Sequence, residues 1–158
     1  MYILWIDPGT TTVWYAVIEK ENHSYRIIDY GVIHTTPKIS LEQKLIEISQ
    51  DIWALIEKYT PLRAWVEKLF FNTNITTGIS VAHARGVIVH EIARHGIEFY
   101  EYTPLQVKKA LTGNGAAKKT QLQKAIQLIF WLTELPTPDD AADAIAIAYM
   151  TALEREKI

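Results

Sequence analysis

Short runs of apolar, β-branched and aromatic residues at the start of the chain predict three strands. The first covers residues 2–7, and Pro8-Gly9 stops it with a strong turn signal. Residues 12–20 and 25–34 follow, with only a polar tetrapeptide between them. Because so short a connection joins strands as a hairpin, we expect three antiparallel neighbours.

Helical periodicity begins after these strands. Ser40 is a suitable N-cap, and apolar residues then recur every three or four positions until the helix ends near Pro61. Residues 62–67 predict a fourth strand, and a long helix follows over about 76–95. One face of that helix carries small and apolar residues that permit close approach of another helix: Ile75, Ile79, Ala82, Gly86, Val89 and Ala93.

The remaining third of the chain predicts one strand and three helices. A fifth strand over residues 98–102 leads to Thr103-Pro104, an N-cap followed by proline at the first helical position. That helix stops at Gly113, a second covers residues 118–132, and a last one starts at Thr137-Pro138 and runs to about Glu154.

This order of elements predicts an α/β fold with one mixed five-stranded sheet. The first three strands would be antiparallel and the last two parallel, because parallel pairing needs crossover connections. Helices are expected on both faces of the sheet. With 158 residues, 49% of them hydrophobic, and no repeat or linker, residues 1–158 are expected to form a single domain.

The composition indicates the cellular location of the protein and limits the metal ligands that it can supply. No run approaches about 18 uninterrupted apolar residues, and the N-terminus has no basic flank, so we expect a cytoplasmic protein without a membrane partner. The sequence has no cysteine, which excludes disulfides, thiolate metal ligands and a cysteine nucleophile. Any metal ion must therefore be bound by oxygen or imidazole.

Four carboxylates stand at positions that could meet. Asp7 and Glu67 each end a predicted strand, and Asp140 and Asp143 lie three residues apart on one face of the last helix. If the first and fourth strands are parallel neighbours, Asp7 and Glu67 project from the same sheet edge. Such a cluster would need cations to offset its repulsion, and an all-oxygen donor set favours Mg²⁺ or Mn²⁺.

Each of these acids also has an ordinary structural explanation. Asp7 could belong to a common Asp-Pro-Gly turn, and Glu67 could be a charge at a strand end. Asp140 could favour the dipole at the start of a helix. Asp143 is harder to explain in this way, because it interrupts an apolar stretch in which an unpaired charge would be costly.

The formal net charge of −2 by itself disfavours a nucleic-acid partner, but one segment of the chain is locally basic. No acidic residue occurs from Tyr102 to Thr133. The lysines of this zone could bind phosphates or could form a solvated helical face: Lys108, Lys109, Lys118, Lys119 and Lys124.

Five sequence blocks, in this order, resemble the RuvC-type resolvases over nearly the whole chain: IDPG at 6–9, VEKLFF at 66–71, HARGV at 83–87, EYTPLQVKKALTGNGAAKKTQL at 101–122 and DAADAIAIA at 140–148. The resemblance implies an RNase H-like fold, a homodimer, and a nuclease that resolves four-way (Holliday) DNA junctions by paired nicks, leaving 5′-phosphates. It also implies metal-binding roles for Asp7, Glu67, Asp140 and Asp143. We expect them to hold two Mg²⁺ ions in each active site, or Mn²⁺ in their place.

The same resemblance implies roles for further residues. Phe70 matches an aromatic residue near the junction centre, where a ring could stack on an unpaired base. Lys108 and Lys119 match basic residues near the scissile phosphate, Lys119 with a catalytic role, and Lys109 and Lys118 would add to DNA binding. The helix over about 76–95 matches the dimer interface. The family also suggests a branch-migration motor as a partner.

The chain departs from the family pattern at several positions. Trp5, Trp14 and Ala16 stand where the family usually has glycine, and Asp139 duplicates a carboxylate beside Asp140. Two other interpretations stay open at this point. One is a junction-binding protein without activity, and the other is an ATP-binding domain, because Asp7-Pro-Gly-Thr-Thr-Thr also resembles the phosphate loop of the actin and sugar-kinase superfamily.

Overall fold

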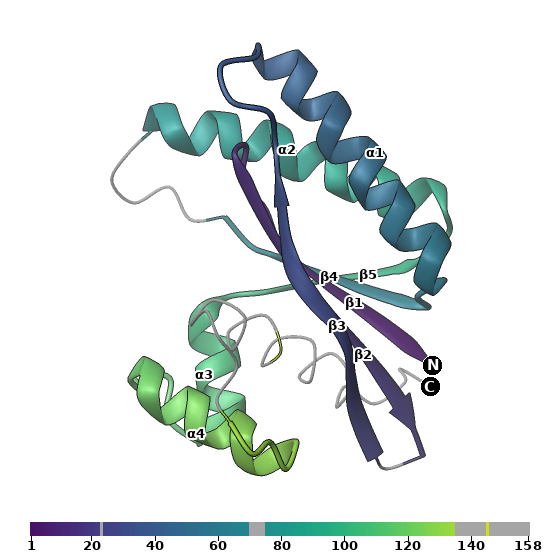
Figure 1. Ribbon diagram of the computed structural model, residues 1–158. Helices are drawn as coiled ribbons and strands as arrows, with labels where there is room; N and C mark the ends of the chain where they lie inside the picture. Colours follow the sequence, from purple (N-terminus) through teal and green to yellow (C-terminus); the bar gives the residue numbers. More distant parts are fainter. Residues whose placement is uncertain (23, 70–74, 135–144, 146–158) are drawn as a thin grey trace.

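The strands form one mixed five-stranded sheet in the order β3-β2-β1-β4-β5. The computed structural model describes residues 1–22, 24–69, 75–134 and 145 (Figure 1). β1–β2 and β2–β3 pair antiparallel, whereas β1–β4 and β4–β5 pair parallel, which confirms the predicted sheet. The bounds are β1 (Tyr2–Asp7), β2 (Thr12–Glu21), β3 (Ser24–His34), β4 (Arg63–Glu67) and β5 (Glu98–Tyr102).

The helices begin where the sequence predicts and differ mainly at their ends. They are α1 (Leu41–Tyr59), α2 (Ile75–Arg94), α3 (Pro104–Thr112) and α4 (Lys119–Ile129). The prediction for α4 ran three residues too far, because Trp131 has the left-handed φ of 53° that ends a helix. The last predicted helix lies outside the described residues except for Ile145, which is helical.

Two capping boxes start helices at the predicted positions. The Ser40 hydroxyl accepts from the Gln43 amide at 3.4 Å, and the Gln43 side chain accepts from the Ser40 amide at 3.2 Å. Thr103 and Gln106 repeat this exchange at the start of α3, at 3.2 and 2.9 Å. Gly113 then ends α3 with a φ of 74°, which a residue without Cβ adopts without strain.

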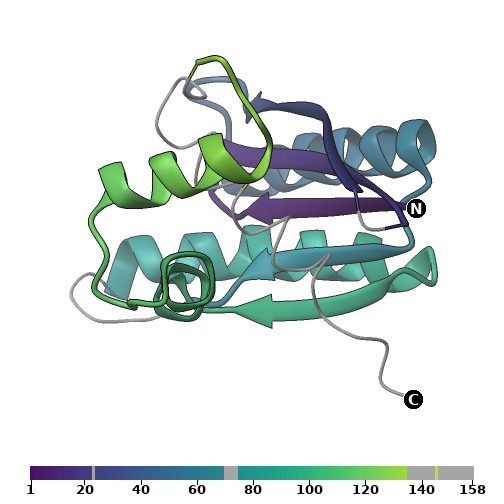
Figure 2. The ribbon, with the colours of Figure 1, turned by 90° about the horizontal axis from the view of Figure 1, so that it is seen from below.

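Helices cover both faces of the sheet, as predicted. α1 and α2 pack side by side on one face, and α4 packs on the other, with α3 beyond the sheet edge (Figure 2). The face under α1 and α2 holds the larger set of buried residues, including Leu4, Ile6, Val66 and Ile88. Within the described part of the chain, no helix is both long enough and apolar enough to cross a membrane.

α2 does not pack on the sheet through the small-residue face identified in the sequence. Its fully buried apolar residues are Ala84, Ile88 and Ile92, whereas Gly86 is exposed and Ile79 is 50% exposed. α2 therefore has two apolar sides, and the side with the larger residues faces the sheet. The side with the small residues faces solvent and the groove beside α1.

Candidate functional site

Asp7 and Glu67 end adjacent parallel strands, as the sequence hypothesis required. The register pairs Ile6 of β1 with Val66 of β4, so the next residue on each strand is one of the two carboxylates. Neighbouring strands lie about 4.8 Å apart. Both side chains are half-buried. The structure therefore brings these two predicted ligands to the same edge of the sheet.

Strand alternation places both carboxylates on the sheet face that α4 covers. Ile6 and Val66 belong to the core under α1 and α2, whereas Trp5 and Trp65 belong to the core under α4. Because successive side chains point to opposite faces, the side chains of Asp7 and Glu67 lie on the same face as those of the two tryptophans. α4 and the two acids thus share one side of the sheet.

An aromatic row lies directly behind the two carboxylates on this face. Trp5 pairs with Trp65, and Trp65 pairs with Tyr100 of β5. The Trp65 and Tyr100 rings are stacked, with centroids 5.5 Å apart and an interplanar angle of 12°. Trp5 is 2% exposed and Trp65 is fully buried. Sequence reasoning singled out Trp5 but missed the row, because only the strand register aligns its members.

Trp14, the second bulky residue where the family resemblance leads us to expect glycine, lies beside the site. It is directly opposite Asp7 in the β1–β2 register and is half-buried. Residues directly opposite in an antiparallel pair point to the same face. The indole and the carboxylate are therefore neighbours on the α4 side of the sheet.

The turn after Asp7 is held tightly. A Cβ on Gly9 would lie 2.2 Å from the carbonyl oxygen of Thr12, so only glycine fits there. The Thr35 hydroxyl donates to the Thr10 carbonyl at 2.8 Å, and the Thr35 amide donates to the Thr11 carbonyl at 3.1 Å. These bonds tie the turn to the end of β3.

Asp140, Asp143 and Asp139 lie outside the described residues, and so does Phe70. Ile145 is described and is completely buried in the same core cluster as Trp5 and Trp65. Among the described residues, no group of three or more His, Asp or Glu side chains is arranged to hold a metal ion. Asp7 and Glu67 are the two described members of the predicted set.

Two of the predicted DNA-binding lysines, Lys108 and Lys109, lie on α3. The other two lie at the start of α4. β5 leads into α3 at the edge where β1, β4 and β5 end, and the first turn of α4 lies toward the same edge (Figures 1 and 2). Lys108 and Lys119 are half-buried, whereas Lys109 and Lys118 are exposed.

Lys118 and Lys119 occupy the N-cap and first position of α4, and the first turn contains no acidic residue. Cations at a helix N-terminus are disfavoured by the helix dipole by about 0.3–1 kcal/mol. The helix dipole therefore disfavours the charges of both lysines at these positions. The combined positive charge of the lysines and the helix end would attract an anion such as phosphate.

Sequence reasoning missed Arg85, which it quoted only as part of a family block. The Arg85 Nε donates to the Glu67 backbone carbonyl at 3.1 Å, and the same guanidinium forms an ion pair with Glu101. Burial lowers the pKa of Arg85 from its ordinary value. No local signal in the sequence links these positions, which only the β4–β5 pairing and the packing of α2 bring together.

Comparison with known proteins decides the family. The model of the family described as "Crossover junction endodeoxyribonuclease RuvC" matches residues 3–151. The chain belongs to the RuvC family. Proteins of that name from Petrotoga mobilis and Halothermothrix orenii are 46% and 48% identical to it, over 149 and 148 residues. The alignments cover 94% of this chain and 91% and 90% of those proteins.

A solved RuvC structure has the same fold. Thermus thermophilus RuvC in complex with a Holliday junction substrate superposes with a TM-score of 0.88 at 29% identity, covering 96% of this chain and 93% of that one. This likeness confirms the RNase H-like mixed sheet expected from the sequence.

Proposed function

We propose that this RuvC-family chain is a metal-dependent endonuclease that resolves four-way DNA junctions by paired symmetric nicks. One observation carries the proposal: Asp7 and Glu67, the two described members of the predicted carboxylate set, end adjacent parallel strands on one sheet face. The likeness to a RuvC bound to a Holliday junction supports the substrate. Residues 1–158 would act as a single endonuclease domain in the cytoplasm.

The residues present fit a divalent metal site. Asp7 and Glu67 supply hard oxygen donors, and the sequence offers no thiolate that would favour a softer metal. Asp140 and Asp143 would complete the site, and burial of Ile145 on the Asp7 side of the sheet supports that placement. Two Mg²⁺ ions, or Mn²⁺ in their place, would supply an activated water and stabilise the leaving oxygen.

The protein's own residues would bind and orient the scissile phosphodiester. Lys108 and Lys119 would hold the phosphate next to the carboxylates, with Lys109 and Lys118 contacting the flanking backbone. Phe70 would stack on an unpaired base at the junction centre. The tight turn after Asp7 and the aromatic row behind it would keep the carboxylate in place without metal.

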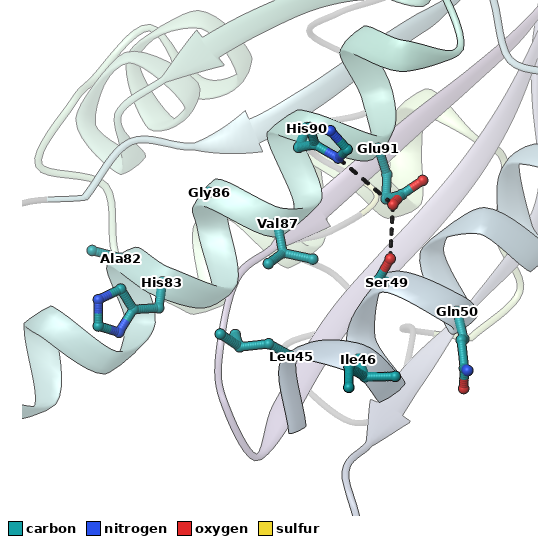
Figure 3. Close-up of a pocket in the computed structure, with 10 residues that line it drawn as sticks. All are labelled: Leu45, Ile46, Ser49, Gln50, Ala82, His83, Gly86, Val87, His90 and Glu91. Carbon is teal, nitrogen blue, oxygen red and sulfur yellow. Dashed lines mark hydrogen bonds and ion pairs between the residues drawn. The ribbon is translucent and has the colours of Figure 1, made fainter. Parts of the chain in front are cut away.

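We also propose a homodimer built on α2 and the groove beside it. The groove lies between α1 and α2, where Val87 from α2 points toward Leu45 from α1; His83, Gly86 and Ile46 also line it (Figure 3). Ile46 and Ile79 expose 56% and 50% of their surface. A two-fold interface here would set two active sites at a fixed separation, as a symmetric junction requires. A branch-migration motor would be a further partner.

Gly86 provides a test of the dimer. A Cβ at Gly86 would meet nothing within 4 Å, so Gly86→Arg should leave each subunit folded while placing a long side chain in the interface. Sedimentation equilibrium should show a dimer for the wild type and a monomer for the variant. Ala54→Arg, exposed on another side of α1, serves as a control and should remain dimeric. A dimeric Gly86→Arg protein would exclude this surface.

The decisive experiment is cleavage of a synthetic mobile four-way junction, with linear duplex and three-way junction as controls, in Mg²⁺, Mn²⁺ or EDTA. We expect paired nicks with 5′-phosphates on the four-way junction only, and only with metal. Asp7→Asn should abolish cutting and leave junction binding intact. Binding without cutting in any metal would instead indicate a junction-binding protein without activity.

A further inference from the structure

Arg85 joins two strand ends from the sheet face opposite to the two carboxylates. It lies on α2 between the buried residue Ala84 and the exposed residue Gly86, and its side chain is 20% exposed. Its Nε donates to the Glu67 carbonyl at 3.1 Å, while another guanidinium nitrogen binds the Glu101 carboxylate. The guanidinium carbon also lies 6.0 Å from the centre of the Phe99 ring.

The geometry explains why the contact to Glu67 is through its backbone. Val66 belongs to the core under α2, so the Glu67 side chain points to the other face. Glu101 pairs with Val66 in the parallel register, so the side chains of Glu101 and Val66 both lie on the α2 side of the sheet. Arg85 can therefore bind the carbonyl of one strand and the carboxylate of the next while leaving the Glu67 carboxylate to the α4 face.

We infer that Arg85 is a positioning residue that holds the end of β4, and with it the Glu67 carboxylate, in place beside Asp7. The inference rests on the proposed metal-binding role of Glu67. At the end of β4, Glu67 pairs with Tyr102 of β5, and its carbonyl accepts the hydrogen bond from Arg85, so Arg85 adds a side-chain contact to the strand end that carries the carboxylate. A ligand carboxylate has to be placed to within about 0.5 Å, and loss of an outer partner typically weakens metal binding 10–100-fold.

The side chain chemistry suits this role and suggests the variants. A guanidinium presents several donors in one rigid plane and can serve a carbonyl and a carboxylate at once, whereas an ammonium is a point charge. Arg85→Met keeps an unbranched apolar stem and removes every donor. Arg85→Lys keeps the charge but not the planar fork. Arg94→Met, on the exposed end of the same helix, is the matched control.

The test measures Mn²⁺ binding to the metal-free protein by electron paramagnetic resonance, without DNA, together with the urea midpoint of each protein. We expect Arg85→Met to raise the Kd for Mn²⁺ 10–100-fold, with Arg85→Lys between it and the wild type. Arg94→Met should stay within twofold of the wild type. Cleavage by Arg85→Met should recover as Mn²⁺ is raised, because the rate falls through lost metal occupancy.

The outcomes separate this inference from the proposed function. If the wild type neither binds Mn²⁺ nor cuts junctions, the proposed function fails. If the wild type does both, a Kd for Arg85→Met within twofold of the wild type overturns the positioning role, whatever the change in urea midpoint. Should Arg85→Met fail to fold, Arg85→Lys decides in its place, and an unchanged Kd for this variant likewise overturns the inference.

Discussion

Replacing Trp5 by glycine, the residue that the family resemblance leads us to expect at this position, should destabilise this chain severely. Trp5 is 2% exposed and packs in one cluster with Trp65, Ile126 of α4 and Ile145. A family pattern alone would make the glycine the safer residue. The packing makes the opposite prediction, because the indole fills the space between the sheet and α4.

The size of the effect follows from burial. Truncating a buried tryptophan to alanine costs about 3–5 kcal/mol, and glycine in a strand costs roughly 0.5–1 kcal/mol more. A loss of about 4–6 kcal/mol is a large part of the 5–15 kcal/mol by which proteins are typically stable. At about 2–4 °C per kcal/mol for a chain of this size, the melting temperature should fall by roughly 8–24 °C.

Urea denaturation of the wild type and of Trp5→Gly, followed by circular dichroism in EDTA, measures this loss. Trp53→Ala is the control, because it removes the same side chain from a position on α1 that is 49% exposed. We expect this control to lose less than about 1 kcal/mol, as exposed substitutions usually do. A loss below 2 kcal/mol for Trp5→Gly, with an unchanged m value, would refute the packing of Trp5 between the sheet and α4.

Two further predictions concern single charges. Glu47 accepts from the Thr36 amide at 2.7 Å and from its hydroxyl at 2.8 Å, which lowers the pKa of Glu47 below its ordinary 4.5. The stabilisation by the Glu47 carboxylate is therefore present above about pH 4.5 and is lost as the pH falls through the lowered pKa. Glu47→Gln should lose less stability over this pH range than the wild type, as measured by urea denaturation from pH 6 to 3. Parallel pH profiles of the free energy of unfolding for the two proteins would contradict this. Lys119→Ala should slow junction cleavage at least about tenfold with little change in the melting temperature, because a lysine at the start of α4 opposes the helix dipole. An unchanged cleavage rate would contradict a catalytic role for Lys119.

Local signals in the sequence predicted the elements well because the physical causes are themselves local. Pro8-Gly9 ends β1, and Ser40 and Thr103 start α1 and α3 through hydrogen bonds that span only three residues. The proximity of Asp7 and Glu67 was predicted only on the condition that the first and fourth strands are parallel neighbours. The structure meets that condition.

The parts that the sequence could not predict depend on register and on the choice between two apolar helix faces. The row from Trp5 through Trp65 to Tyr100 exists only because three strands pair without an offset, and a shift of one residue would separate its members. α2 has small and apolar residues on two sides, so periodicity could not show which side covers the sheet. The proposed role of Arg85 depends both on the strand register and on which face of α2 covers the sheet.

These features would allow the candidate site to form before a metal ion binds. Two carboxylates separated by about the spacing of neighbouring strands, roughly 5 Å, would repel each other by roughly 1–3 kcal/mol, depending on solvent screening. The sheet ladders, the aromatic row and the proposed positioning by Arg85 would hold the two strand ends together against that repulsion. Metal removal should therefore leave the circular dichroism spectrum unchanged and lower only the melting temperature, whereas unfolding on chelation would show that the metal, rather than the packing, assembles the site.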